Sequence, residues 1–141
     1  MRKKLLFVAD NPPRQGWGCP IIIKRHLERL DPDAWSIHVA SLRGNEYGCT
    51  LPREWASLSL RPLAKLRRFP VRGSFRLVQL YWNARIRLWA GNRADTIITY
   101  LDHELSAMAG TLSRQLSVPL NVFVFDHRET WESDPKSRET M

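Results

Sequence analysis

Two glycines, Gly16 and Gly18, lie between an apolar run and a helical pattern near the start of the chain. Glycines let a backbone approach a ligand closely, and the N-terminus of the following helix favours an anion. A contact with a phosphate or an acceptor is one interpretation of this loop, and a plain turn is the other. Because Ile21 replaces the third glycine of G-x-G-x-x-G and no Gly-Lys-Ser/Thr follows, a Rossmann dinucleotide site is disfavoured and a P-loop is excluded.

A second group with possible chemistry is the pair Asp126-His127, which directly follows an apolar run. The imidazole of His127 could accept a proton or hydrogen-bond a sugar hydroxyl or phosphate near neutral pH. A surface histidine in a loop is the alternative, and the sequence pattern favours neither interpretation over the other. Asp102-His103 repeats the pair, but Asp102 is better interpreted as a helix cap than as a metal ligand. We therefore expect no metal and no cofactor.

A basic segment extends from residue 56 to residue 94, which holds nine of the 22 Lys and Arg residues and no Asp or Glu. Its irregular part contains Lys65, Arg67, Arg68 and Arg72, which we predict to contact an anionic substrate or a lipid surface. Nucleic acid is the less favoured partner. The helical pattern after it carries aromatic residues and arginines. We predict that the aromatic residues pack inward on a sheet and that the arginines point into solvent.

Apolar runs typical of buried strands alternate with helical patterns along the chain. The expected strands cover 5–9, 35–42, 56–60, 94–100 and 120–125, and helices are expected to follow Pro20, Ser74 and Asp102. Such alternation favours a parallel sheet with right-handed crossovers. The predicted fold class is α/β, a Rossmann-like open parallel sheet of about five strands flanked by helices in a single domain.

If the strand order is 3-2-1-4-5, the loops 10–19, 102–104 and 126–129 share one edge of the sheet. Ligands of open parallel sheets bind beyond the carboxyl ends of the strands, where the strand order reverses. One cleft at that edge could therefore hold all three loops. We expect the functional site there.

The residues also resemble a known family. Segments 5–13 and 16–18 and the helix ending at 25–30 are similar to the start of family-4-type GT-B glycosyltransferases. Segment 94–100, the helix after it and Val118-Pro119-Leu120 continue the resemblance. It implies half of a GT-B fold, in which the first domain mainly binds the acceptor and a second domain mainly binds the nucleotide sugar.

The resemblance also implies roles for individual residues. Gly16 and Gly18 would lie near the donor phosphates, His127 would line the active site as the catalytic residue, and Asp126 would contact donor or acceptor. The family often has His-Asp where this chain has Asp126-His127, and Trp17 stands where a second glycine is common. The acidic motif that holds the donor in the family is not present in this sequence.

We therefore expect residues 1–126 to form a Rossmann-like, acceptor-side GT-B domain and 127–141 to be a charged tail or a truncated continuation. The leading hypothesis is a domain that helps to transfer a sugar from a nucleotide sugar to a cell-envelope glycan or glycolipid. It would be inactive without a donor-binding domain, which a partner subunit could supply.

Two other hypotheses remain open. One is a non-catalytic α/β binding module for a membrane surface or nucleic acid, and the other is a flavodoxin-like or other nucleotide-binding domain. The separated Cys19 and Cys49 form no C-x-x-C unit, and no apolar run approaches the roughly 20 residues of a membrane span. The expected location is the cytoplasm, with peripheral contact at the inner membrane face.

Overall fold

The computed structural model describes residues 1–13, 19–42, 51–61, 74–101 and 105–124. They form five strands and three helices that alternate along most of the chain. The elements are β1 (Lys3–Ala9), α1 (Cys19–Leu27), β2 (Trp35–Ser41), β3 (Ala56–Ser59), α2 (Ser74–Trp89), β4 (Thr96–Tyr100), α3 (Leu105–Leu116) and β5 (Leu120–Phe123). The predicted α/β class is confirmed.

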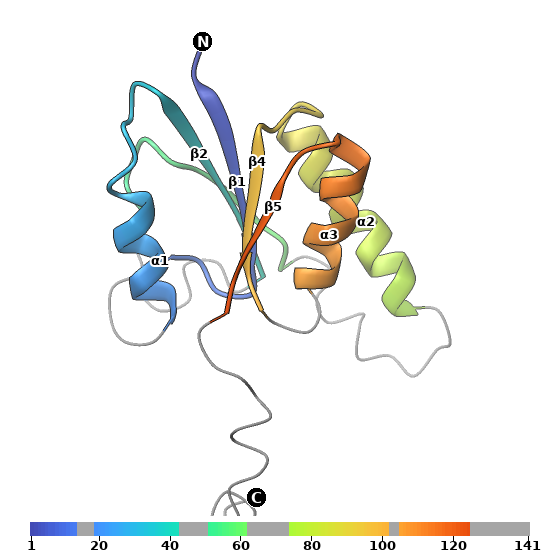
Figure 1. Cartoon of the computed structure of the whole chain (residues 1–141). Helices are drawn as coiled ribbons and strands as arrows, with labels where there is room; N and C mark the ends of the chain where they lie inside the picture. The colour runs from blue at the N-terminus through green and yellow to red at the C-terminus, as the bar shows by residue number, and fades with distance from the viewer. Residues whose placement is uncertain (14–18, 43–50, 62–73, 102–104, 125–141) are drawn as a thin grey trace, which may run out of the picture.

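All strand pairs are parallel, and the sheet has the order β3-β2-β1-β4-β5. This is the order under which the loops 10–19, 102–104 and 126–129 were expected to share one edge. Helix α1 covers one face of the sheet, and α2 and α3 lie side by side on the other (Figure 1). The strands all end at one edge, as parallel strands must, so the connections that follow β1, β4 and β5 leave the sheet on the same side.

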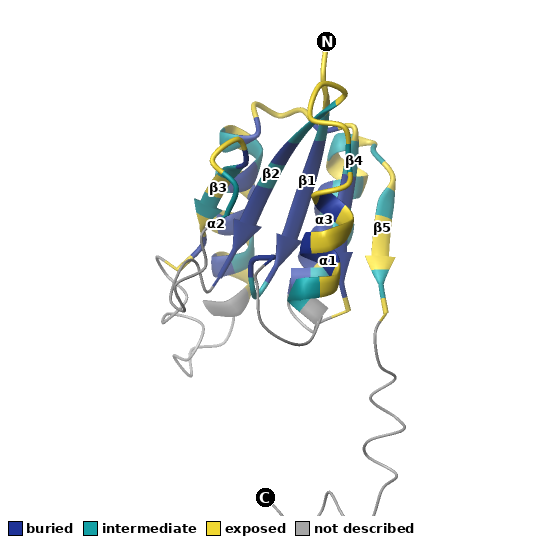
Figure 2. Ribbon diagram, turned by 90° about the vertical axis from the view of Figure 1, so that its left-hand side faces the viewer, coloured by how far each residue is buried: buried dark blue, intermediate teal, exposed yellow. Residues whose placement is uncertain are grey.

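The central strand β1 is buried on both faces. Leu5 and Phe7 belong to the core under α1, whereas Leu6 and Val8 belong to the core under α2 and α3. A strand buried on both faces reads as a continuous apolar run, which is why β1 was predictable. The edge strand β5 is much more exposed than β1 and β2 (Figure 2).

Backbone hydrogen bonds define the C-terminal ends of α2 and α3. Helix α2 ends in a Schellman motif, in which Gly91 has a φ of 68° and the Asn92 N–H donates to the Arg87 carbonyl at 2.7 Å. Helix α3 ends in a similar way at Ser117, with a φ of 53°. After α2, the Asp95 carboxylate accepts a hydrogen bond from the Lys4 N–H at 2.6 Å. This contact fixes the turn before β4 to the start of β1.

Helix α2 buries one side and exposes another. Val78, Trp82 and Ile86 are buried in the core under α2 and α3, as predicted. Leu77, Leu80 and Leu88 are 69%, 63% and 74% exposed. Tyr81 is 40% exposed, so the prediction that the aromatic residues pack inward is wrong for Tyr81. The physical reason is that the apolar residues of α2 occupy more of its circumference than the sheet can cover.

Trp82 and Leu80 provide a stability test within one helix. Trp82→Ala removes a fully buried ring and is expected to lower the free energy of unfolding by about 3–5 kcal/mol. Leu80→Ala removes a 63% exposed side chain and should change it by no more than about 0.5 kcal/mol. Urea unfolding followed by circular dichroism measures both. Equal losses would contradict the assignment of the two faces.

A partly buried histidine lies on β2 beside the end of α2. The His38 ring is 5.1 Å from the Trp89 ring, its Nε2 is 3.0 Å from the Ser36 hydroxyl oxygen, and its Nδ1 is buried without a hydrogen-bond partner in the part of the chain that the structure describes. Burial, and secondarily the Lys4 ammonium, lower the pKa of His38 from its ordinary value of 6.5. The folded state therefore favours the neutral ring.

This shift predicts how stability depends on pH. The unfolded chain protonates His38 near pH 6.5, whereas the folded chain takes up that proton at a lower pH, so stability falls as the pH drops below about 6.5. His38→Gln should flatten the loss of stability between about pH 7 and pH 5. The matched control His26→Gln, at an exposed position, should follow the wild type in chemical unfolding across that range.

Candidate functional site

The strand order reverses between β1 and β4, and the two strands separate there. Their ladder runs from Leu5–Thr96 to Phe7–Ile98. Beyond it, β1 continues to Ala9 in register with β2, and β4 continues to Tyr100 in register with β5. The last two residues of β1, Val8 and Ala9, therefore do not pair with the last two residues of β4, Thr99 and Tyr100. A reversal of this kind is where open parallel sheets form a ligand crevice.

A side chain replaces the missing ladder at this point. The Thr99 hydroxyl, which is fully buried, donates a hydrogen bond of 2.7 Å to the Val8 carbonyl. A buried carbonyl that loses its ladder partner needs another donor. Thr99 provides it just beyond the last residue pair of the ladder between β1 and β4.

The next residue of β4 reaches the loop after β1. The Tyr100 hydroxyl accepts a hydrogen bond of 2.9 Å from the Asn11 N–H, and the Tyr100 ring lies 6.2 Å from the ring of Phe7. The ring is buried, so its oxygen occupies a fixed position at the switch point. In addition, the Leu101 N–H donates to the Phe123 carbonyl at 2.9 Å. The ends of β1, β4 and β5 are thereby connected.

Two polar side chains at this edge were not among the predicted site residues, although they begin the loop 10–19 that was expected at the site. Asp10 and Asn11 directly follow β1, and both are half-buried. A carboxylate accepts hydrogen bonds and a carboxamide both donates and accepts them, so the pair suits a ligand with several hydroxyl groups. Polar residues directly after a strand that is buried on both faces are the sequence feature that could have identified them.

All the predicted site residues lie outside the described residues. This holds for Gly16 and Gly18, for Asp126 and His127, and for the basic residues Lys65, Arg67, Arg68 and Arg72. The strands that precede the glycine loop and the Asp126-His127 pair, β1 and β5, both lie next to β4 in a parallel sheet and end at the same edge. The roles of these eight residues stay predictions.

A groove of about 710 Å³ lies on the α1 face of the sheet, which no sequence pattern had indicated. Ile23, Leu27 and Leu30 from the α1 side and Ile98 and Phe123 from the sheet supply its apolar walls. The His26 ring lies 5.9 Å from the Phe123 ring across it. The groove lies over β4 and β5, beside α1, where no described helix covers the sheet. Lys3, His26, Asp95, Thr96 and Asn121 also line the groove. Because most of its surface is apolar, we interpret it as an uncovered packing face.

Other kinds of site find no support among the residues that the structure describes. No group of three or more His, Cys, Asp or Glu residues there could hold a metal ion. No helix in the described segments is long and apolar enough to cross a membrane.

Comparison with known proteins identifies the fold. No protein-family model and no curated protein matches the chain in sequence. Among solved structures, the UDP-GlcNAc 2-epimerase of Methanocaldococcus jannaschii is similar, with a TM-score of 0.52 and 15% identity. The similarity covers 96% of this chain and 35% of the epimerase chain. At this identity the match shows a shared Rossmann-like architecture, and this chain spans about a third of the length of its neighbour.

The Tyr100 hydroxyl gives a test of the switch-point geometry. Tyr100→Phe removes the acceptor of the Asn11 N–H and should cost about 1 kcal/mol of unfolding free energy. It should also speed amide hydrogen exchange at Asn11, while Leu101, whose N–H donates to the Phe123 carbonyl, remains protected. Exchange measured by NMR decides this. Unchanged exchange at Asn11 would show that Tyr100 does not fix the loop.

Proposed function

We propose that this chain is the acceptor-side half of a GT-B-type glycosyltransferase. In this proposal a sugar passes from a nucleotide sugar to a cell-envelope glycan or glycolipid, on the cytoplasmic side of the membrane. The observation that carries it is the structural match over 96% of the chain to an enzyme named for UDP-GlcNAc. That match agrees with the family resemblance of segments 5–13 and 94–100.

The switch point supports an acceptor-binding role. Asp10 and Asn11 are half-buried at the end of β1, and the Asn11 N–H donates to the Tyr100 hydroxyl. Sugars are recognised through hydrogen bonds to hydroxyl groups, and a carboxylate with a carboxamide can both accept and donate such bonds. Gly16, Gly18, Asp126 and His127 would complete the site from loops that leave the same edge, with His127 as the residue nearest the transferred proton.

The uncovered groove supports the idea of a half-enzyme. Parallel sheets occur almost only with both faces covered, yet the groove leaves Ile98 and Phe123 half-buried on the α1 face. A second domain or a partner subunit that brings the donor site would also cover this face. The chain spans only 35% of the length of its structural neighbour, which leaves room for such a domain.

Titration of the purified chain tests the proposal. A panel of soluble oligosaccharides is expected to shift the backbone NMR signals of Asn11, Leu101 and Val124, which follow β1, β4 and β5. UDP-GlcNAc, whose main binding domain would be elsewhere, should bind weakly or not at all. Asn11→Ala keeps the backbone donor to Tyr100 and should weaken oligosaccharide binding by roughly two- to tenfold, the loss of one neutral hydrogen bond. His127→Ala should weaken it similarly.

The matched control is Asn121→Ala, because Asn121 is an exposed asparagine of the same sheet that bonds Thr96 at the opposite end of β4. It should leave oligosaccharide binding unchanged. Tight binding of UDP-GlcNAc by this chain alone would overturn the assignment to the acceptor side. An absence of oligosaccharide shifts around the switch point would remove the proposed acceptor site.

A further inference from the structure

Helix α2 has a continuous apolar stripe on its outer side. At about 100° of rotation per residue, its members fall within an arc of about 100° along the whole helix. They are Leu77, Leu80, Tyr81, Ala84 and Leu88, all of them exposed. Single exposed apolar residues are ordinary, but a contiguous apolar patch on a helix points to an interaction surface. We call this set the α2 stripe.

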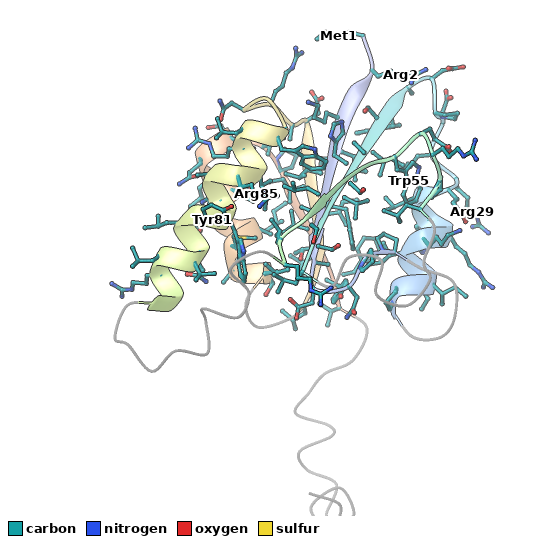
Figure 3. The ribbon with its side chains drawn as sticks, turned by 180° about the vertical axis from the view of Figure 1, so that it is seen from behind. Met1, Arg2, Arg29, Trp55, Tyr81 and Arg85 are labelled. Atoms are coloured by element: carbon teal, nitrogen blue, oxygen red, sulfur yellow. The ribbon has the colours of Figure 1, made fainter. Side chains whose placement is uncertain are left out.

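Arginines border the α2 stripe on both sides. On the helical wheel, Arg76 and Arg87 lie along one margin and Arg85 lies along the other. The Arg85 guanidinium donates a hydrogen bond of 3.1 Å to the Tyr81 hydroxyl, and Figure 3 shows the two side chains next to each other on α2. The helix contains no acidic residue, and neither does any position from 56 to 94. Any partner of this face must therefore tolerate or neutralise a row of cations.

The charges and side chains of this face indicate which kind of partner it can bind. A second copy docked through the same face would bring two sets of arginines together without a carboxylate on either helix, which is unfavourable. Single-stranded nucleic acid would neutralise the arginines, but it binds through stacking on aromatic rings, and the stripe is mostly leucine. An anionic bilayer accepts leucine and tyrosine at the headgroup boundary and places lipid phosphates beside the arginines.

We infer that the α2 stripe and its bordering arginines form a membrane-binding surface that docks the chain in the plane of an anionic bilayer. The leucines enter the interface, and Arg76, Arg85 and Arg87 extend to the phosphates. The buried side of α2, with Trp82 and Ile86 in the core, keeps the sheet attached above it. This inference depends on α2 alone and goes beyond the proposed sugar transfer.

Vesicle flotation tests the docking. The full chain is expected to float with vesicles of phosphatidylcholine and phosphatidylglycerol and to remain unbound with phosphatidylcholine alone. Replacing Leu77, Leu80 and Leu88 together by Gln should weaken binding at least about tenfold, because the apolar area that enters the interface is lost. The matched control replaces Ile22, Leu101 and Val122, which are also exposed apolar residues, and should float like the wild type.

A second pair of variants tests the charges. Replacing Arg76, Arg85 and Arg87 together by Gln should reduce binding to the anionic vesicles by about tenfold or more. Replacing the exposed Arg25, Arg29 and Arg53 serves as the control of equal charge and should have a clearly smaller effect. Circular dichroism and thermal unfolding establish that each variant is folded before its binding is compared.

Four results would overturn the inference. They are failure of the wild type to float, equal flotation with neutral and anionic vesicles, unchanged flotation of the leucine variant, and equal losses for the two arginine variants. Self-association that the leucine variant abolishes, without vesicle binding, would assign the stripe to a second copy instead. Since oligosaccharide titration uses no lipid, failure here leaves the proposed function standing, and the reverse also holds.

Discussion

The arrangement of the whole domain depends on one short pairing, the ladder between β1 and β4. Three residue pairs join the two halves of the sheet before the strands separate, and the Thr99 hydroxyl spans the gap to the Val8 carbonyl. Because the chain changes direction across this ladder, α1 falls on one face and α2 and α3 fall on the other. The same separation marks the edge of the sheet at which a ligand would bind.

The fold could be predicted because each strand and helix is indicated by a short stretch of the sequence. Each buried strand is an apolar run stopped by turn residues, as in Leu5 to Ala9 before Asp10, and alternation with helices favours parallel order. The bounds differ where distant contacts decide them. Strand β4 begins at Thr96, after Asp95 has bonded Lys4, a partner 91 residues away that no local pattern reveals.

The location of the candidate site in the fold could be predicted from the sequence, but most of the residues that form it could not. The reversal of strand order locates the edge, and three of its loops were expected from sequence. The Tyr100 hydroxyl was not, because its role depends on the backbone of Asn11 across the strand gap. Likewise, the pattern of α2 predicted a helix that covers the sheet with its aromatic residues inward, but it did not reveal that the apolar residues of the α2 stripe remain outside.

The central position of β1 also governs how the chain can assemble. Its first neighbour, β2, follows within about 30 residues, whereas Phe7 meets Ile98 only after 91 more residues have been made. At about 5–20 residues per second on a ribosome, one edge of β1 remains unpaired for roughly 5–18 s until β4 has been made. During that interval the most apolar strand of the protein has an open edge, and such pairing over long sequence separation is slow. Until β4 emerges, the β1–α1–β2 unit can pair only one edge of β1.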